Sequence, residues 1–374
     1  MYRELGIYSD WVAAAGHDEG FPVARPGLET QRLVRDALGF SALEEHPREP
    51  RLECRWERDG IEGEEVSWSV GYGPRTTAWV LKPAGAEAPL PGVLALHDHG
   101  DFKFYGKEKI AYGPEPPAAI MTAYRDAYYG GRAFANALAR AGFVVLVHDV
   151  FLWGSRKFPW ESMPEVVRRA AETLAPPAPP FLGAGEVAVY NTAADLHEHI
   201  VEKYCRVLGT TFAGMISYED RVAAAYLASR PDVLPERIGC IGLSGGGNRS
   251  ALLAATCDRI SAAVIVGMMS TYGGLLDRHV STHTWMFFPA GWPRHGDWPD
   301  LAACRAPSPL LVQYDLDDEL FTVEGMRAAD ERLREHYAGA GSPDAYSGEF
   351  YPGLHKFDLE MQGSAFAWLK ARLG

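Results

Sequence analysis

Short runs of apolar residues alternate with longer amphipathic segments from residue 91 to the end of the chain. Such runs indicate strands that are buried on both faces, as in a parallel sheet covered by helices. The intervening segments have the spacing of helices that pack one apolar face. The pattern predicts an α/β fold with a mostly parallel central sheet and helices on both faces. We expect its strands at residues 92–97, 143–149, 237–242, 260–267, 308–315 and 345–351.

The segments around this core divide the chain. Residues 64–73 and 76–85 alternate between apolar and polar positions around a Gly-Pro turn, which predicts an antiparallel hairpin. Residues 1–60 are expected to form a helical and connecting extension, and residues 61–374 a single catalytic domain. Two long excursions, 151–208 and 268–300, are candidate insertions over a pocket. The first contains the proline-rich stretch 174–185, which favours a stiff loop.

Composition and charge exclude several functions. The chain has 374 residues and a net charge of −13, without a basic stripe, so we expect no nucleic-acid partner. It has neither a signal peptide pattern nor an apolar stretch long enough to span a membrane, so we expect no membrane partner. Five cysteines without a C-x-x-C pair indicate reduced thiols and a cytoplasmic location. No cofactor-binding pattern is evident, and the oligomeric state stays open.

A cluster of glycines around Ser244 lies between a predicted strand and a predicted helix. Asn248 occupies the position where a phosphate-binding loop needs lysine, and Ser250 breaks the dinucleotide-binding pattern. The segment 242–246 instead fits G-x-S-x-G, the sharp turn that exposes a nucleophilic serine at the end of a strand. The sequence therefore predicts that Ser244 is a nucleophile.

A serine needs a base, and in this arrangement an acid and then a histidine follow it along the chain. Among the twelve histidines, His336 and His355 follow the acidic segment after the strand at 308–315. His336 lies in a charged helix and is expected on a solvated face. His355 lies in a Pro-Gly loop and is the expected base. The acid is one of three carboxylates in the segment, Asp315, Asp317 and Asp318.

From about residue 64 to 374 the chain resembles α/β-hydrolases, closest to the dienelactone-hydrolase and acetyl-xylan-esterase-like branch. The resemblance is carried by LALHDHGD, RAGFVVLVHDVFLWGSR, GLSGGG, PLLVQYDLDDELF and YPGLHKF. In similar proteins the acid strand ends His-Gly-x-x-Asp, which selects Asp318, with Asp317 as the alternative. The sequence departs from that pattern by having Asp315 where glycine is usual.

The resemblance also implies an oxyanion hole made by two backbone N–H groups. One belongs to Gly245, and the other to Asp101, with Gly100 as the alternative. The carboxylate of Asp101 would oppose a nearby oxyanion unless it is paired, and three lysines are candidate partners. These are Lys103, Lys107 and Lys109.

Two histidines at strand spacing, His97 and His99, raise the alternative of a zinc site. No third or fourth ligand is evident, so we expect loop-supporting histidines and no metal. A second pair, His197 and His199, lies two positions apart on a probable helix and is expected on its solvated face.

Aromatic residues in the two excursions are candidates for the substrate pocket. We expect its contacts from Trp285, Trp153, Arg156 and His99.

These features predict a serine hydrolase that cleaves small carboxylic esters through an acyl-enzyme and needs no cofactor. Two alternatives remain: a serine peptidase similar to the prolyl-oligopeptidase catalytic domain, and a ligand-binding protein with the same fold but no turnover.

Overall fold

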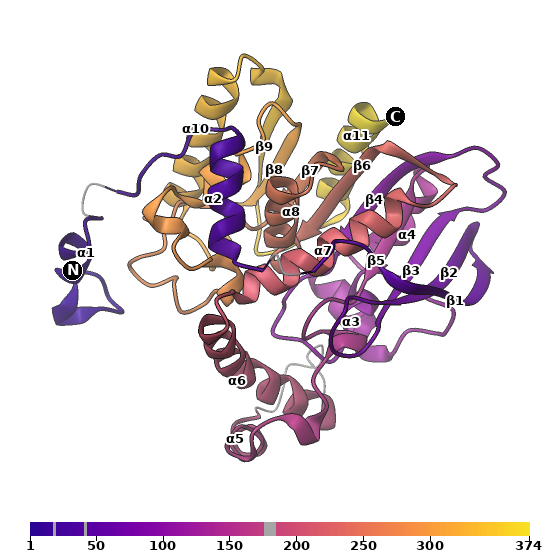
Figure 1. The fold of residues 1–374 in the computed structure, drawn as a ribbon, viewed down its shortest axis with the longest axis horizontal. Coiled ribbons are helices and arrows are strands. Elements are labelled where there is room, and N and C mark those ends of the chain that lie inside the picture. The colour runs from indigo at the N-terminus through magenta and orange to yellow at the C-terminus, as the bar shows by residue number, and fades with distance from the viewer. Residues whose placement is uncertain (18–19, 41–42, 176–184) are drawn as a thin grey trace.

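A single twisted sheet forms the centre of the computed structural model, which describes residues 1–17, 20–40, 43–175 and 185–374 (Figure 1). Within this part of the chain the sheet has nine strands, in the order β1-β2-β3-β5-β4-β6-β7-β8-β9. The first four in this order pair antiparallel, and the others pair parallel. The strands are β1 (Arg48–Arg58), β2 (Ile61–Ser69), β3 (Thr76–Pro83), β4 (Leu90–Leu96), β5 (Val144–His148), β6 (Val233–Leu243), β7 (Ile260–Val266), β8 (Leu310–Asp315) and β9 (Tyr346–Tyr351).

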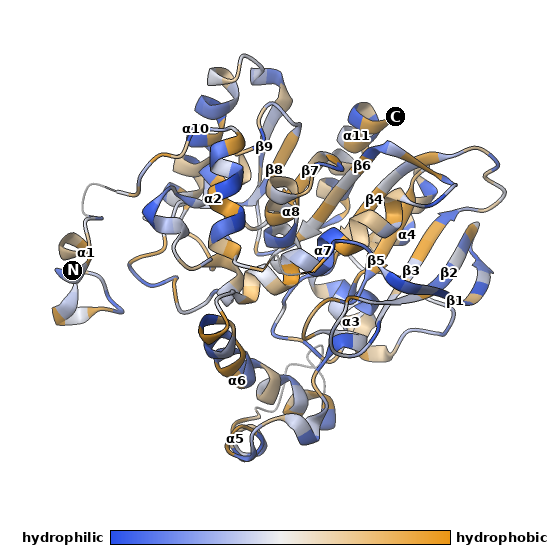
Figure 2. Ribbon diagram, in the orientation of Figure 1, coloured by the Kyte–Doolittle hydropathy of each residue, from blue (hydrophilic) through white to orange (hydrophobic). Residues whose placement is uncertain are grey.

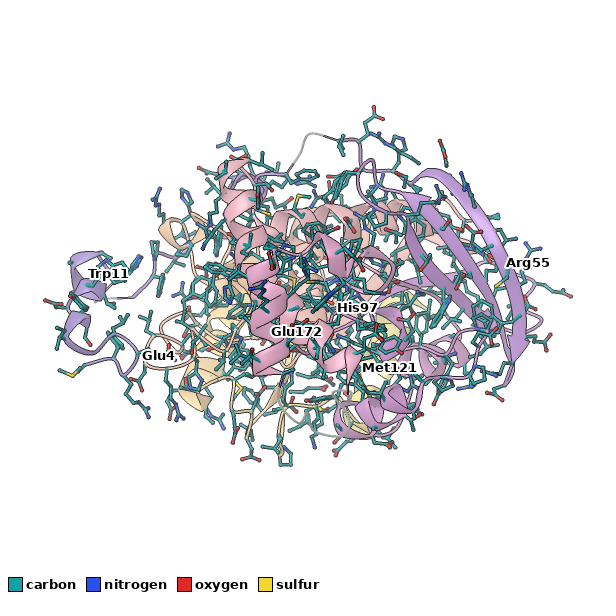
Figure 3. All side chains as sticks on the ribbon, turned by 90° about the horizontal axis from the view of Figure 1, so that it is seen from below. Glu4, Trp11, Arg55, His97, Met121 and Glu172 are labelled. Atoms are coloured by element: carbon teal, nitrogen blue, oxygen red, sulfur yellow. The ribbon has the colours of Figure 1, made fainter. Side chains whose placement is uncertain are left out.

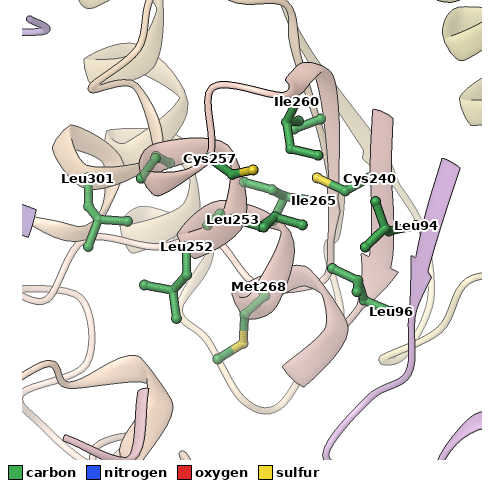
Figure 4. Packing of buried hydrophobic residues seen from close by; sticks show 14 of the residues in the cluster. Leu94, Leu96, Cys240, Leu252, Leu253, Cys257, Ile260, Ile265, Met268 and Leu301 are labelled. Carbon is green, nitrogen blue, oxygen red and sulfur yellow. The ribbon is translucent and has the colours of Figure 1, made fainter. Parts of the chain in front are cut away.

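Helices cover both faces of the sheet, as the sequence predicts. Successive residues of β4 point to opposite faces: Leu94 and Leu96 pack with α7 and α8, whereas Val93 and Ala95 pack with α4 and α11. Figure 4 shows Leu94 and Leu96 with the apolar side of α8, and Figure 2 shows apolar residues concentrated on the central strands. The helices are α1 (Trp11–Ala14), α2 (Leu28–Leu38), α3 (Ala119–Tyr128), α4 (Phe134–Arg140), α5 (Glu165–Leu174), α6 (Glu186–Val207), α7 (Phe212–Ala228), α8 (Gly245–Thr256), α9 (Trp298–Ala302), α10 (Val323–Gly339) and α11 (Leu359–Leu373).

The N-terminal segment differs from its prediction at one place. The helix expected there is α2, but residues 48–58 form strand β1 rather than a helical or connecting segment. Leu52, Cys54 and Trp56 alternate with charged residues there. However, seven of the eleven residues of β1 are charged and nearly all are exposed, so the segment lacks the buried apolar face by which a strand is recognised. The predicted hairpin is β2 and β3, and it continues the main sheet through antiparallel pairing of β3 with β5.

The first excursion carries α5 and α6, which project from the body in Figure 1 and share a small apolar cluster that includes Val167 and Tyr190. The core of its proline-rich stretch, residues 176–184, lies outside the described residues. The second excursion carries short helical turns and α9. Figure 3 shows Trp11 at one end of the molecule and Arg55 of β1 at the other, with His97 between them. In the described part of the chain, no helix combines the length and the apolar character needed to cross a bilayer.

Candidate active site

Ser244 lies at the turn between β6 and α8, in a backbone conformation that side chains rarely adopt. Its φ is 56° and its ψ is −123°. The Ser244 N–H donates to the Val266 carbonyl at 2.9 Å, which fixes the turn to β7. Close packing requires glycine two residues after the serine, because a Cβ at Gly246 would lie 2.1 Å from the Leu96 carbonyl oxygen. Such a strained, over-determined turn is a frequent feature of functional sites.

His355 and Asp318 meet at the ends of the last two strands. His355 Nδ1 lies 2.6 Å from Asp318 Oδ2, and His355 Nε2 is buried and has no hydrogen-bond partner in the described chain. Asp317 faces elsewhere, because its Oδ2 accepts the Gly353 N–H at 2.7 Å. The other candidate histidine, His336, pairs with a different carboxylate: it is buried in α10 with its Nε2 2.6 Å from Asp300 rather than solvated.

Ser244, Asp318 and His355 line one open cavity of about 450 Å³. The carboxyl ends of β4, β6 and β8 meet there, as expected for a ligand crevice in a parallel sheet. Further walls come from α3 and from residues 282–284 of the second excursion. The lining residues are Asp98, His99, Gly100, Asp101, Tyr124, Ala127, Tyr128, Leu243, Ser244, Gly245, Met268, Thr282, His283, Thr284, Asp318, Glu319, Leu320, Leu354 and His355.

Two carboxyl groups set the charge state of His355. Burial alone would lower the pKa of His355, but Asp318 and, more weakly, Asp315 outweigh this effect and raise it above the usual value. Asp315 itself is fully buried at the end of β8, and its Oδ2 accepts the Lys356 N–H at 3.1 Å. Burial raises the pKa of Asp315 to about 7. The departure from the His-Gly-x-x-Asp pattern therefore places a second carboxyl group beside the histidine.

The loop after β4 brings a different N–H to the serine from the one predicted. The Asp101 N–H donates to His99 Nδ1 at 3.1 Å and is thereby occupied within the loop. A Cβ at Gly245 would lie 2.5 Å from the backbone nitrogen of His99, so these two residues are in close contact. Neither the Gly245 nor the His99 N–H has an acceptor in the part of the chain that the structure describes. Gly245 and His99 therefore both offer free N–H groups beside Ser244, whereas the N–H of the predicted donor Asp101 is bound within the loop.

The lysines expected to pair with Asp101 have other partners. Lys109 Nζ lies 3.2 Å from Asp98 Oδ2 and also donates to the carbonyls of Asp98 and His99, which holds the loop. Lys103 pairs with Glu198, and Lys107 pairs with Asp149, each at 2.8 Å. The carboxylate of Asp101 is instead mostly exposed to solvent and lies 3.1 Å from His99 Nδ1.

Glu198 connects the loop after β4 to both excursions. Its carboxylate, only 4% exposed, lies 2.8 Å from His99 Nε2 and 2.8 Å from Lys103 Nζ, and it accepts the Thr284 hydroxyl at 2.8 Å. Burial alone would raise the pKa of Glu198, but Lys103 and His99 outweigh this and hold it below its usual value. Its neighbour His197 is also buried, at 7% exposure, so the expectation of a solvated helix face is wrong there.

A second buried ion pair anchors the helix behind Ser244. Arg249 of α8 binds Asp220 of α7 at 2.7 Å and donates to the His97 carbonyl at 3.1 Å. Asp220 also lies 2.8 Å from His148 at the end of β5. The ends of β4 and β5 and the helices α7 and α8 are therefore tied together by these charged groups. Sequence reasoning missed both clusters, because each joins segments far apart in the chain.

Three of the predicted pocket residues lie outside the cavity lining. Arg156 is buried and paired with Glu219 at 2.5 Å. Trp153 packs behind the loop after β4, where its Nε1 donates to the His99 carbonyl at 3.3 Å. Trp285 is half-buried and donates to His199 of α6 at 2.9 Å. Of the four, His99 does line the cavity, and the aromatic wall comes instead from Tyr124 and Tyr128 of α3.

The geometry also bears on metal binding. His97 is buried, its Nδ1 contacts the Asp98 carbonyl oxygen at 3.0 Å, and it does not share a ligand cluster with His99. In the described chain, two groups of three ligand-type side chains have atoms within 4.8 Å of one another: His99 with Asp101 and Asp195, and His355 with Asp315 and Asp318. Lys103 already places a cation beside the first group, and the second contains the buried hydrogen bond between His355 and Asp318.

Comparisons with known proteins agree with this architecture. The chain matches no protein-family model. It is 25% identical over 273 residues to a Bacillus subtilis (strain 168) protein named "Putative hydrolase YtaP", covering 73% of this chain and 75% of that protein.

Two solved structures are similar to it in fold. A glucuronoyl esterase from Solibacter usitatus has a TM-score of 0.62 at 16% identity, with 92% of each chain covered. Acetyl xylan esterase 1 from Thermoanaerobacterium sp. JW/SL YS485 has a TM-score of 0.59 at 17% identity, with 95% of this chain and 97% of that chain covered. The predicted α/β-hydrolase fold is confirmed by these similarities and by the sheet order.

Proposed function

We propose that this protein is a serine hydrolase that cleaves carboxylic esters. One observation supports the proposal: His355 lines the same cavity as Ser244, its Nε2 is unpartnered among the described residues, and its Nδ1 lies 2.6 Å from buried Asp318. A base oriented by a carboxylate and placed beside a strained serine is the arrangement needed to activate a hydroxyl. The names of the structural neighbours, which are esterases, favour ester over peptide substrates.

In the proposed reaction, Ser244 Oγ attacks the ester carbonyl carbon while His355 Nε2 takes the hydroxyl proton. The N–H groups of Gly245 and His99 stabilise the oxyanion, and Asp318 stabilises the imidazolium that forms. Collapse of the intermediate breaks the bond to the alcohol, which leaves with the proton from His355. Water, deprotonated by His355, then attacks the acyl-enzyme, and the carboxylic acid and free serine are released.

Ser244→Ala and His355→Ala test this proposal. We expect each to lower turnover of 4-nitrophenyl acetate to near background, because members of such a triad act as a unit. Ser244→Ala should also abolish labelling by a fluorophosphonate, which reacts with activated serines. A peptide anilide tests the peptidase alternative in the same assay. Labelling that persists in Ser244→Ala, or unchanged turnover in His355→Ala, would contradict the assignment.

The cellular location is likewise a proposal. The structure describes all five cysteines as free, and four of them are buried. Free thiols are typical of proteins in a reducing compartment, which favours the cytoplasm.

A further inference from the structure

The lining of the cavity has a one-sided charge. It contains four carboxylates and, among the described residues, neither lysine nor arginine. The positions that the structure does not describe, 18–19, 41–42 and 176–184, contain no lysine or arginine in the sequence. The four carboxylates are Asp98, Asp101, Asp318 and Glu319.

Two of these carboxylates have a partner that balances their charge, since Asp98 pairs with Lys109 and Asp318 with His355. Asp101 is 78% exposed to solvent, and the nearby His99 Nδ1 accepts the Asp101 N–H. Glu319 follows Asp318 directly, is exposed at the cavity, and has no ion-pair or hydrogen-bond partner in the described chain. Glu319 therefore presents an uncompensated negative charge beside the proposed base.

The histidines of the lining do not supply an opposing free charge. His283 contacts the Leu320 carbonyl at 3.0 Å, and burial lowers its pKa to about 4, so it is neutral at pH 7. His99 has a carboxylate against each ring nitrogen, Asp101 on one side and Glu198 on the other. His355 must be neutral to act as a base. An anionic group bound here would thus lose hydration without gaining a cationic partner.

We propose that the cavity selects esters that are uncharged or cationic near the scissile bond and discriminates against those carrying a carboxylate, sulfate or phosphate there, with Glu319 as the main determinant. This inference rests on the proposed function and adds the substrate class. The protein's net charge of −13 acts in the same direction, since a field of one sign repels like-charged substrates before they bind.

Three phenyl acetates that differ only in the para substituent test the proposal: carboxymethyl, its neutral analogue carbamoylmethyl, and trimethylammoniomethyl. The methylene group insulates the ester from the substituent, so intrinsic reactivities are similar. At low ionic strength we expect kcat/KM for the carboxymethyl ester to be lower than for the carbamoylmethyl ester by about 10-fold, as one unpaired charge at close range produces. The trimethylammoniomethyl ester should equal or exceed the neutral one.

Glu319→Gln should reduce the ratio of kcat/KM for the neutral ester to kcat/KM for the anionic ester by about 3-fold or more. Glu87→Gln should leave this ratio unchanged. Glu87 is a matched control because it is exposed and precedes β4, at the opposite end of the sheet from Ser244. In the wild-type protein, about 1 M NaCl should also reduce this kcat/KM ratio, because it shortens the Debye length to about 3 Å.

Equal kcat/KM for the anionic and neutral esters, or a gap that neither Glu319→Gln nor salt changes, would overturn the proposal. If no ester is hydrolysed, the proposed function fails instead. Calorimetric binding of the same three compounds then tests charge selection by itself, with tighter or equal binding of the carboxymethyl compound counting against it.

Discussion

The two walls of the cavity hold their polar side chains in different ways. On the wall formed by the ends of β6, β8 and β9, a single buried hydrogen bond joins Asp318 to His355, and each residue lies in the loop just after its own strand. On the opposite wall, His99 is held by a cluster of buried charges centred on Glu198, which reaches it from α6. The first wall thus depends on strand ends that any protein of this fold has. The second depends on an excursion of this particular chain, so its loss should affect stability and chemistry together.

The largest loss of activity is expected when the hydrogen bond of the first wall, between Asp318 and His355, is altered. Asp318→Asn should lower kcat by about 10⁴, because an amide at this position favours the wrong tautomer of His355. Asp317→Asn should cost far less, since that carboxylate binds the Gly353 N–H. Kinetics with 4-nitrophenyl acetate measure both, and thermal melts should show little change for Asp318→Asn. A larger loss for Asp317→Asn would mean that the acid had been assigned wrongly.

On the second wall, Glu198→Gln should lower the free energy of unfolding by about 3 kcal/mol, because it leaves the buried Lys103 without its main counter-charge. Turnover should fall too, since His99 loses its support. Glu186→Gln is the control, because Glu186 is exposed on the same helix and has no ion-pair or hydrogen-bond partner among the described residues. Denaturant unfolding curves measure the difference. If both variants were equally stable, the two walls would not differ as described.

The pH dependence of kcat/KM tests how the carboxyl groups of the first wall act on His355. The base acts when neutral, and the pKa of His355 is raised, so kcat/KM should rise with pH to a half-maximum above the usual histidine value. Asp315→Asn removes one of the carboxyl groups that favour the imidazolium, so the half-maximum should move down by about one pH unit or less. A pH–rate profile with Asp317→Asn as the control measures this, and an upward shift would contradict it.

Trp285→Ala should have the smallest effect. Its side chain packs on His199 and Arg206 of α6 and does not line the cavity. The variant should change the kcat/KM ratio of acetyl to hexanoyl esters by less than about 3-fold and lower stability by about 1 kcal/mol. A 10-fold change in that ratio would instead support the prediction from sequence that Trp285 contacts the substrate.

The contrast between the walls also explains what could be predicted from the sequence. Ser244 and His355 lie in short segments whose spacing and order follow from strand ends meeting at one edge of a sheet. Glu198 lies in DLHEHI, which has the composition of a solvated helix face. It is buried by contacts with His99 and Thr284, which lie 99 residues earlier and 86 residues later in the chain. The available signal was the group of three lysines Lys103, Lys107 and Lys109, because charge so close to a buried strand end needs partners.

Aromatic residues were a poor guide for a related reason. Trp153 and Trp285 could equally support a loop or contact a ligand, and composition does not distinguish these roles. The walls that α3 provides were missed because Tyr124 and Tyr128 lie in a helix that the sequence analysis did not single out. At Asp101, the N–H predicted to stabilise the oxyanion donates instead to a side chain of the same loop, His99.

Strand β1 has a consequence for how this protein behaves beside copies of itself. A strand at the border of a sheet leaves one row of N–H and C=O groups unpaired, and these can recruit another chain into a growing aggregate. The four arginines and three glutamates of β1 are exposed to solvent, and Pro50 has no backbone N–H that could donate to another strand. A second strand would have to desolvate these charges to dock. The feature that hid β1 from sequence analysis therefore protects the molecule from unwanted self-association.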